Sequence, residues 1–197
     1  MQISFGNKNQ PGVSGKSLTQ IHSNKVIVVE DRDQDTGNVE GDSLVTTLSC
    51  VKLSVKTADC VPILLHSQSV VAAVHSGWRG AYSGIIQNTV EVIKSLGGKE
   101  IVAHIGPCIR QDSYEVDEVF YEKFIAQNGS NKRFFNNLHF DLPSYCKAIL
   151  NEFGVMEIFD DGIDTYTTPD LFYSYRYYSK NGLKMESHMR QISSISL

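Results

Sequence analysis

Two short apolar segments separated by three polar residues constrain the fold of this chain more than any other feature. They are Val61–His66 and Val70–His75, with Ser67-Gln68-Ser69 between them. Short apolar runs bounded by turn residues are typical of strands. The short connection predicts an antiparallel hairpin, although its residues are not the Asn-Gly type that hairpin turns favour.

Further strands and helices are predicted on both sides of this hairpin. Alternation or β-branched composition predicts strands at 25–30, 41–47, 51–57, 101–105, 155–159 and 190–195. Helices are predicted from a cap at Ser83 to about Leu96, before Gly97-Gly98, at 116–126, and at 142–153 behind the N-cap Asp141. Because strands and helices do not alternate strictly, the chain is predicted to be α+β with a mixed sheet. Its 197 residues, 41% of them hydrophobic, suit a single domain over 1–197.

The composition argues against several classes of partner. A formal net charge of -4 does not favour a nucleic-acid surface, whereas a small anionic substrate needs only a few arginines. No apolar stretch approaches the roughly 20 residues of a membrane span, and the N-terminal segment does not resemble a signal peptide. We therefore expect a cytoplasmic protein, a monomer or small homo-oligomer, that acts on a small molecule.

The four cysteines, at positions 50, 60, 108 and 146, are widely spaced and form no CxxC pair. In a cytoplasmic chain such cysteines are not expected to form disulfides, so any functional one is a metal ligand or a reactive thiol. Cys108, in the loop Gly106-Pro107-Cys108-Ile109, is included as a candidate catalytic thiol.

The hairpin brings Cys60 and His75 near each other. With a two-residue turn, His66 pairs with Ser69, and Cys60 then lies directly opposite His75 on the same face. A three-residue turn places the two on opposite faces, unless Pro62 interrupts the ladder beside Cys60. The shared face therefore depends on the turn.

Cys60, His75 and His22, which stands just before a predicted strand, are candidate metal ligands. Two imidazoles and a thiolate suit Zn²⁺ and leave a fourth position open for water. The same ligands also resemble a blue-copper site, so Cu²⁺ is a competitor. Taken singly, each of these residues is more often an ordinary core or surface side chain.

The segment Gly77-Trp78-Arg79-Gly80 joins the second hairpin strand to a helix. Glycines let the backbone approach a ligand, and the start of a helix favours an anion. The same pattern also suits a plain strand-to-helix connection, but Arg79 favours an anion site.

Seven segments in order together resemble the laccase-domain (multicopper polyphenol oxidase-like) family, whose bacterial members are described as purine nucleoside phosphorylases with adenosine deaminase activity. They span residues 20 to 176, and the TADCxP and HxGWRG segments are the most specific. They are Gln20-Ile21-His22, residues 41–46 (GDSLVT), 57–62 (TADCVP), 75–80 (HSGWRG), 105–109 (IGPCI) with 114–116 (YEV), 141–142 (DL) and 172–176 (FYSYR).

The resemblance implies a fold of layered mixed sheets with flanking helices, and Zn²⁺ held by His22, Cys60 and His75. It implies phosphorolysis of adenosine, inosine and methylthioadenosine, and hydrolytic deamination of adenosine. Four positions depart from the family's pattern. Ser23 stands where Gly is usual, Ser76 where Ala is usual, Tyr177 replaces a second Arg, and the terminal Gly-Arg stretch is reduced to Met189-Arg190-Gln191.

Polar residues in these segments are candidates for the chemistry. Arginine holds phosphate by paired hydrogen bonds, so Arg79, Arg176 and Arg190 are the phosphate candidates, and Gln20 is a further substrate-binding candidate. Asp59, beside Cys60, is expected either to shuttle a proton or to orient a ligand histidine; a turn-forming role fits it equally well.

Three alternatives stay open on the sequence. A copper polyphenol oxidase of the multicopper kind needs more than the six histidines present, in His-x-His pairs that this chain lacks. A hydrolase could use Cys60 as nucleophile with His75 as base. The chain could also be a non-catalytic partner of another protein.

Overall fold

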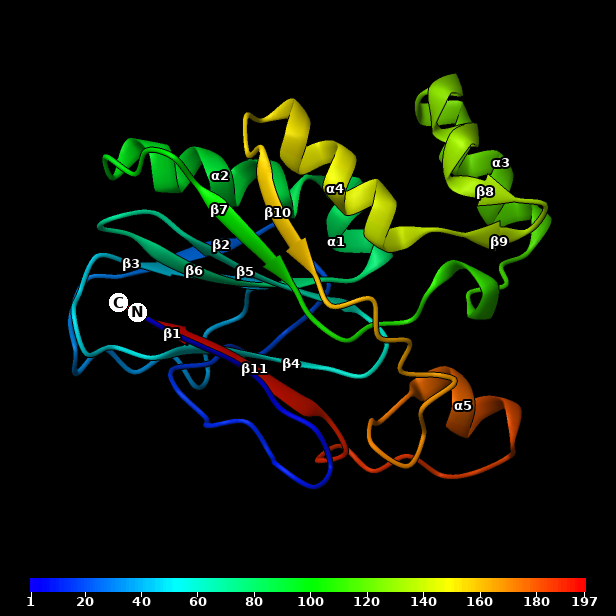
Figure 1. The fold of residues 1–197 in the computed structure, drawn as a ribbon, viewed down its shortest axis with the longest axis horizontal. Helices are drawn as coiled ribbons and strands as arrows, with labels where there is room; N and C mark the ends of the chain where they lie inside the picture. The colour runs from blue at the N-terminus through cyan, green and yellow to red at the C-terminus, as the bar shows by residue number, and fades with distance from the viewer.

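Two β-sheets pack face to face, and helices α2 and α4 cover the outer face of the larger sheet (Figure 1). The computed structural model describes all residues, 1–197. The larger sheet has the strand order β10-β7-β5-β6-β3-β2, and the smaller has β1-β11-β4. The strands are β1 Gln2–Phe5, β2 Val26–Val29, β3 Ser43–Thr46, β4 Leu53–Thr57, β5 Val61–His66, β6 Val71–Ser76, β7 Val102–Ile105, β8 Phe135–Asn136, β9 His139–Phe140, β10 Glu157–Asp160 and β11 Gln191–Ser196.

The helices lie between and after these strands. They are α1 Trp78–Ser83, α2 Ile85–Ser95, α3 Glu118–Gln127, α4 Leu142–Glu152 and α5 Tyr175–Lys180, with 3-10 turns η1 Gln111–Ser113 and η2 Gly129–Phe134. No helix combines the length and the apolar character needed to cross a membrane.

The larger sheet is mixed, which confirms the α+β prediction. β2 pairs parallel with β3 and β10 parallel with β7, while the four central strands pair antiparallel. The end of β10 is tied to its surroundings by Asp160, which accepts two hydrogen bonds from Arg110 at 2.9 and 2.7 Å and also pairs with Lys147 of α4.

Alternation along β5 divides the core in two. Val61, Ile63 and Leu65 pack with the helices, whereas Leu64 packs with the smaller sheet. Cys60, Pro62 and His66 have the parity of Leu64, so they belong to the face of the larger sheet that meets the smaller sheet. That face carries the side chains discussed below.

Three details of the sequence prediction are corrected. The hairpin loop is Ser67–Val70, so His66 pairs with Val71 and not with Ser69. The helix predicted from Ser83 is α2, but it is capped by Gly84, with φ +100°, and an additional short helix, α1, ends at Ser83 just before it. Strand β4 does not alternate cleanly, since Ser54 is also buried and its hydroxyl bonds the backbone of Gly15.

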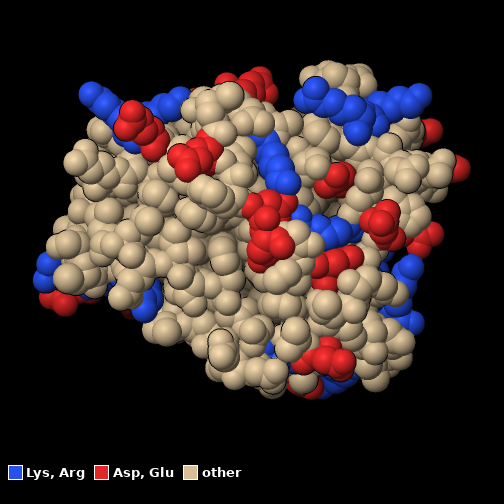
Figure 2. Space-filling view, in the orientation of Figure 1, with Lys and Arg blue, Asp and Glu red and all other residues tan.

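The surface carries charges of both signs. On the face in Figure 2, acidic and basic side chains are interspersed, and much of the left half is uncharged. On this face, therefore, neither acidic nor basic side chains form one large patch, although the chain has a net charge of -4.

Candidate metal centre and its pocket

Cys60 and His75 meet although the turn has neither of the two lengths considered from the sequence. His75 pairs with Pro62, so Cys60 is its diagonal neighbour, two residues along and on the same face. The observed register differs by two residues from that of a two-residue turn. A shift of two leaves every side chain on its original face, whereas a shift of one would have separated the pair.

His22 reaches the same point from a loop before β2. Its backbone has φ +59°, the left-handed region, which turns the imidazole toward the hairpin. The ring lies against the backbone of Gly77, where a Cβ would stand 2.8 Å from His22 Cδ2 and 3.0 Å from Cys60 Sγ. Glycine at this position is therefore a requirement of the close approach.

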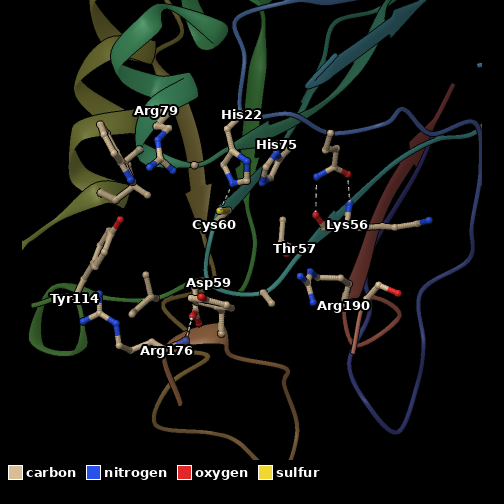
Figure 3. Close-up of a pocket in the computed structure, with 18 of the residues that line it drawn as sticks. His22, Lys56, Thr57, Asp59, Cys60, His75, Arg79, Tyr114, Arg176 and Arg190 are labelled. Carbon is tan, nitrogen blue, oxygen red and sulfur yellow. Dashed lines mark hydrogen bonds between the residues drawn. The ribbon is translucent and has the colours of Figure 1, made fainter. Parts of the chain in front are cut away.

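The three side chains offer their donor atoms to one point, as Figure 3 shows. One ligand atom from each lies within 4.8 Å of the others, and Cys60 Sγ is 3.8 Å from His22 Nε2. A tetrahedral zinc ion with ordinary Zn–S and Zn–N bonds would hold a sulfur and a nitrogen about 3.6 Å apart. The donor set and its spacing fit zinc with little adjustment.

Asp42 organises two of these three ligands. Its side chain is 0% exposed, and Oδ1 accepts hydrogen bonds from His75 Nδ1 at 2.7 Å and from the His22 backbone N–H at 3.0 Å. Oδ2 accepts from the backbone N–H of Ser23 at 2.6 Å and from its hydroxyl at 2.7 Å. The bond to Nδ1 leaves Nε2 of His75 free to act as a ligand.

Orienting a ligand histidine was one of three roles considered for Asp59 from the sequence, and in the structure Asp42 is the carboxylate that contacts His75. Asp42 was quoted only as part of a matched segment. The sequence did contain a signal for Asp42, because a carboxylate directly before a buried strand needs a hydrogen-bonding partner.

The charges in the centre stabilise a thiolate. Burial alone would raise the pKa of Cys60, but the neighbouring His75 and the hydrogen bond with His22 outweigh it and lower that pKa. Burial alone would lower the pKa of His75, but Cys60 and Asp42 together raise it. Burial would likewise raise the pKa of Asp42, but bonds from His75 and Ser23 lower it to about 2. A thiolate is the form in which cysteine binds a metal.

The centre forms one wall of a pocket of about 600 Å³, a size typical of small-molecule sites. Arg79, Arg176, Arg190, Lys56 and Tyr114 also line it (Figure 3). The guanidinium of Arg79 lies 4.7 Å from the Trp78 ring centre, and that of Arg176 lies 5.4 Å from the Tyr114 ring centre. The structure therefore brings all three predicted arginines to the pocket that holds the three candidate ligands.

Asp59 also lines the pocket, but its carboxylate faces the chain around it. It accepts a hydrogen bond from the Thr165 hydroxyl at 2.7 Å and from the backbone N–H of Arg176 at 2.7 Å. Burial is the main influence on Asp59 and raises its pKa, and the Arg176 N–H and Thr165 offset part of this. Asp59 thus fastens the start of α5, from which Arg176 enters the pocket.

Two other predicted residues have different surroundings. Gln20 lines the pocket, but its side-chain amide makes two 2.8 Å hydrogen bonds with the backbone of Lys56, which tie the His22 loop to β4. Cys108 is 0% exposed in the core beside α4 and does not line the pocket. Burial raises the pKa of the Cys108 thiol well above its usual value, so the structure does not place a reactive thiol there.

Layered sheets with flanking helices and a His-Cys-His centre define a laccase-like class of protein, for which a metal is implied. The chain belongs to the family described as multi-copper polyphenol oxidoreductase laccase, whose sequence profile matches residues 8–191. This confirms the resemblance found from the sequence.

Three relatives illustrate the range of the family. The chain is 39% identical over 168 residues to "Purine nucleoside phosphorylase RP494" of Rickettsia prowazekii, covering 81% of this chain and 69% of the relative. It is 36% identical over 157 residues to "Adenosine deaminase RL5" of an unknown prokaryotic organism, covering 69% and 58%. The crystal structure of YfiH from Bacillus licheniformis superposes with a TM-score of 0.80 at 25% identity, covering 91% and 73%. The chain therefore spans roughly two thirds of the length of these relatives.

Proposed function

We propose that this protein is a zinc-dependent purine nucleoside phosphorylase that acts on adenosine, inosine and methylthioadenosine, and that it also deaminates adenosine by hydrolysis. The observation that carries the proposal is one pocket with His22, Cys60 and His75 on one wall and three arginines on the others. The names of the relatives, purine nucleoside phosphorylase and adenosine deaminase, support it. The proposed setting is cytoplasmic, and the proposed state is a monomer or small homo-oligomer.

The arginines are proposed to hold phosphate. In phosphorolysis, phosphate attacks C1′ of the ribose while the bond to the purine breaks and positive charge builds on the sugar. Arg79 and Arg176 are each braced by an aromatic ring, so less freedom is lost when they bind the anion. Arg190, whose guanidinium also bonds the Met189 carbonyl at 2.8 Å, extends the same positive wall.

Deamination needs water, a site that activates it, and a group that moves protons. When bound, zinc supplies a Lewis acid that lowers the pKa of a water toward about 7. Asp59 is the carboxylate nearest in sequence to Cys60 and lines the pocket, and its pKa is raised mainly by burial. A raised pKa makes a carboxyl group easier to protonate, so Asp59 is the proposed proton carrier, a role in which it would release a hydrogen bond from Thr165 or the Arg176 N–H.

The test is a phosphate-dependence assay run beside elemental analysis. Purified protein given inosine and phosphate should release hypoxanthine and ribose 1-phosphate, and should release neither without phosphate. Cys60→Ala should abolish this activity and the bound zinc, while Cys50→Ala, which removes an exposed thiol, should retain both. Full activity in Cys60→Ala would end the proposal, and stoichiometric copper in place of zinc would favour the oxidase alternative.

One observation favours a second candidate, a hydrolase that uses Cys60 as nucleophile and His75 as base. The lowered pKa of Cys60 and the raised pKa of His75 describe a thiolate–imidazolium pair. This candidate predicts product release from a nucleoside without phosphate, and inactivation by iodoacetamide that zinc does not prevent. Protection of the thiol by zinc, together with strict phosphate dependence, would exclude it.

A further inference from the structure

A second pair of histidines lies on the same face of the larger sheet, at the far end of β5. His66 is the last residue of β5, and His104 is in β7. In the register, His66 pairs with Val102 and Leu64 with His104, so the two imidazoles are diagonal neighbours on one face. At about 3.3 Å per residue along a strand, His66 is roughly 20 Å from Cys60. The pair is therefore separate from the pocket described above.

The two rings point their Nε2 atoms at each other. The Nε2 atoms are 3.2 Å apart, and the ring centres are 5.3 Å apart with 22° between the planes. Two imidazoles bound to one tetrahedral ion at ordinary Zn–N distances hold their nitrogens about 3.3 Å apart. The separation thus matches a shared ion as well as it matches a shared proton.

The surroundings keep both rings neutral and hold one of them in place. Burial lowers the pKa of His66 and of His104, and for His104 the nearby His66 lowers it further. The Phe159 ring stacks on His104, with centres 5.1 Å apart and 17° between the planes. Neutral imidazoles are the form that binds a metal, and a fixed ring loses less freedom when it does so.

A carboxylate and open space lie beside the pair. Val102 pairs with His66 on one side and with Glu157 of β10 on the other, so Glu157 lies on the same face of the sheet as His66. Phe159, two residues along β10 on that face, packs on His104. The side chain of Glu157 is exposed, and its charge raises the pKa of both histidines in part. A solvent-open hollow of about 930 Å³ borders His66, so water reaches this side of the pair.

We propose that His66 and His104 are the protein ligands of a second binding site for a divalent transition-metal ion. Imidazole suits Cu²⁺, Ni²⁺ and Zn²⁺, and the general order of affinity places Cu²⁺ above Zn²⁺. With two ligands and no thiolate, this site should bind Zn²⁺ about tenfold more weakly, or weaker still, than the His-Cys-His centre. It does not depend on the proposed function of the pocket.

The test is a titration of chelator-treated protein with Zn²⁺, followed by calorimetry. The wild type should bind two equivalents, the second more weakly, and His66→Gln and His104→Gln should each bind one. His139→Gln, which removes a histidine outside both clusters, should still bind two. Thermal unfolding of each variant checks its fold. If His104→Gln, within β7, unfolds the chain, then His66→Gln, at the end of β5, still provides the test.

A second measurement identifies the ligands directly. In the double variant His22→Gln/Cys60→Ala, one equivalent of Cu²⁺ should give an electron paramagnetic resonance spectrum with coupling to two imidazole nitrogens. Adding His104→Gln should remove that coupling. A single equivalent in the wild type that His66→Gln and His104→Gln leave in place, a second equivalent that survives both substitutions, or a copper spectrum without nitrogen coupling would each overturn the proposal and leave a hydrogen-bonded histidine pair.

Discussion

Replacing Asp42 with asparagine should separate the shape of the metal centre from its electrostatics. Asn is nearly the same size, but one of its two side-chain atoms donates hydrogen bonds and does not accept them. If the NH₂ group takes the Oδ1 position, it faces two donors, the His22 N–H and His75 Nδ1. If it takes the Oδ2 position, it faces the N–H groups of Ile21 and Ser23. Neither orientation satisfies the site.

The magnitude follows from these losses. A buried donor left without a partner costs about 1–3 kcal/mol, and either orientation of the amide leaves at least one buried N–H without an acceptor. We therefore expect a free energy of unfolding about 2–4 kcal/mol smaller in the metal-free variant. Metal affinity should fall about 10–100-fold, because His75 can satisfy the amide by moving its proton to Nε2, the ligand atom.

The assay is Zn²⁺ competition against a chromophoric chelator, beside urea unfolding of metal-free protein. Asp117→Asn is the matched control, since Asp117 caps α3 through the Phe120 N–H and asparagine caps a helix equally well. The control should change stability by less than about 0.5 kcal/mol. Zinc affinity within twofold of wild type in Asp42→Asn would refute the reasoning.

Three further substitutions test other parts of the structure. Gly77→Ala places a Cβ 2.8 and 3.0 Å from two ligand side chains and should weaken Zn²⁺ binding at least tenfold in the same titration, whereas Gly129→Ala, with nothing within 4 Å, should not. Burial would raise the pKa of Asp160, but its cationic partners lower it from 3.8 to about 2. Its ionised form thus adds stability above about pH 4 that is lost as pH falls toward 2. Asp160→Asn should therefore cost about 1–2 kcal/mol at pH 6 and almost nothing near pH 2 in urea unfolding, and an equal cost at both would contradict this. Asp59→Ala should free the start of α5 and raise KM for phosphate about tenfold through Arg176, and a change in kcat alone would argue against that link.

Much of the fold could be predicted because local signals and burial agree. Asp141 caps α4 through the Ser144 N–H, as expected, and Gly97, with φ +85°, follows α2 where the helix was predicted to stop. β1, α1 and α5 were missed because all three are short and lack a strong pattern. β1 is held by pairing with β11 at the other end of the chain, a contact that no local signal announces.

The site could be predicted only in part, for a related reason. The ligand types were readable from His22, Cys60 and His75, but what holds them depends on contacts distant in sequence. Asp42 meets His75 across 33 residues, and Asp59 meets Arg176 across 117. Local chemistry gave Asp59 a role beside Cys60, whereas its backbone, with φ +86°, turns the carboxylate toward α5.

Parity along β5 explains why two histidine-containing clusters occupy one face of the sheet. Cys60 and His66 are six positions apart, so both share the face of Leu64, and each has a diagonal partner on a neighbouring strand. What differs is the loop supplied at each end. At the Cys60 end, the His22 loop and Asp42 add a third ligand and a buried carboxylate, which make a tight centre open to a pocket. At the His66 end, no third ligand joins the pair, and a solvent-open hollow borders His66. The same sheet face therefore predicts one tight and one weak metal equivalent, in that order of affinity.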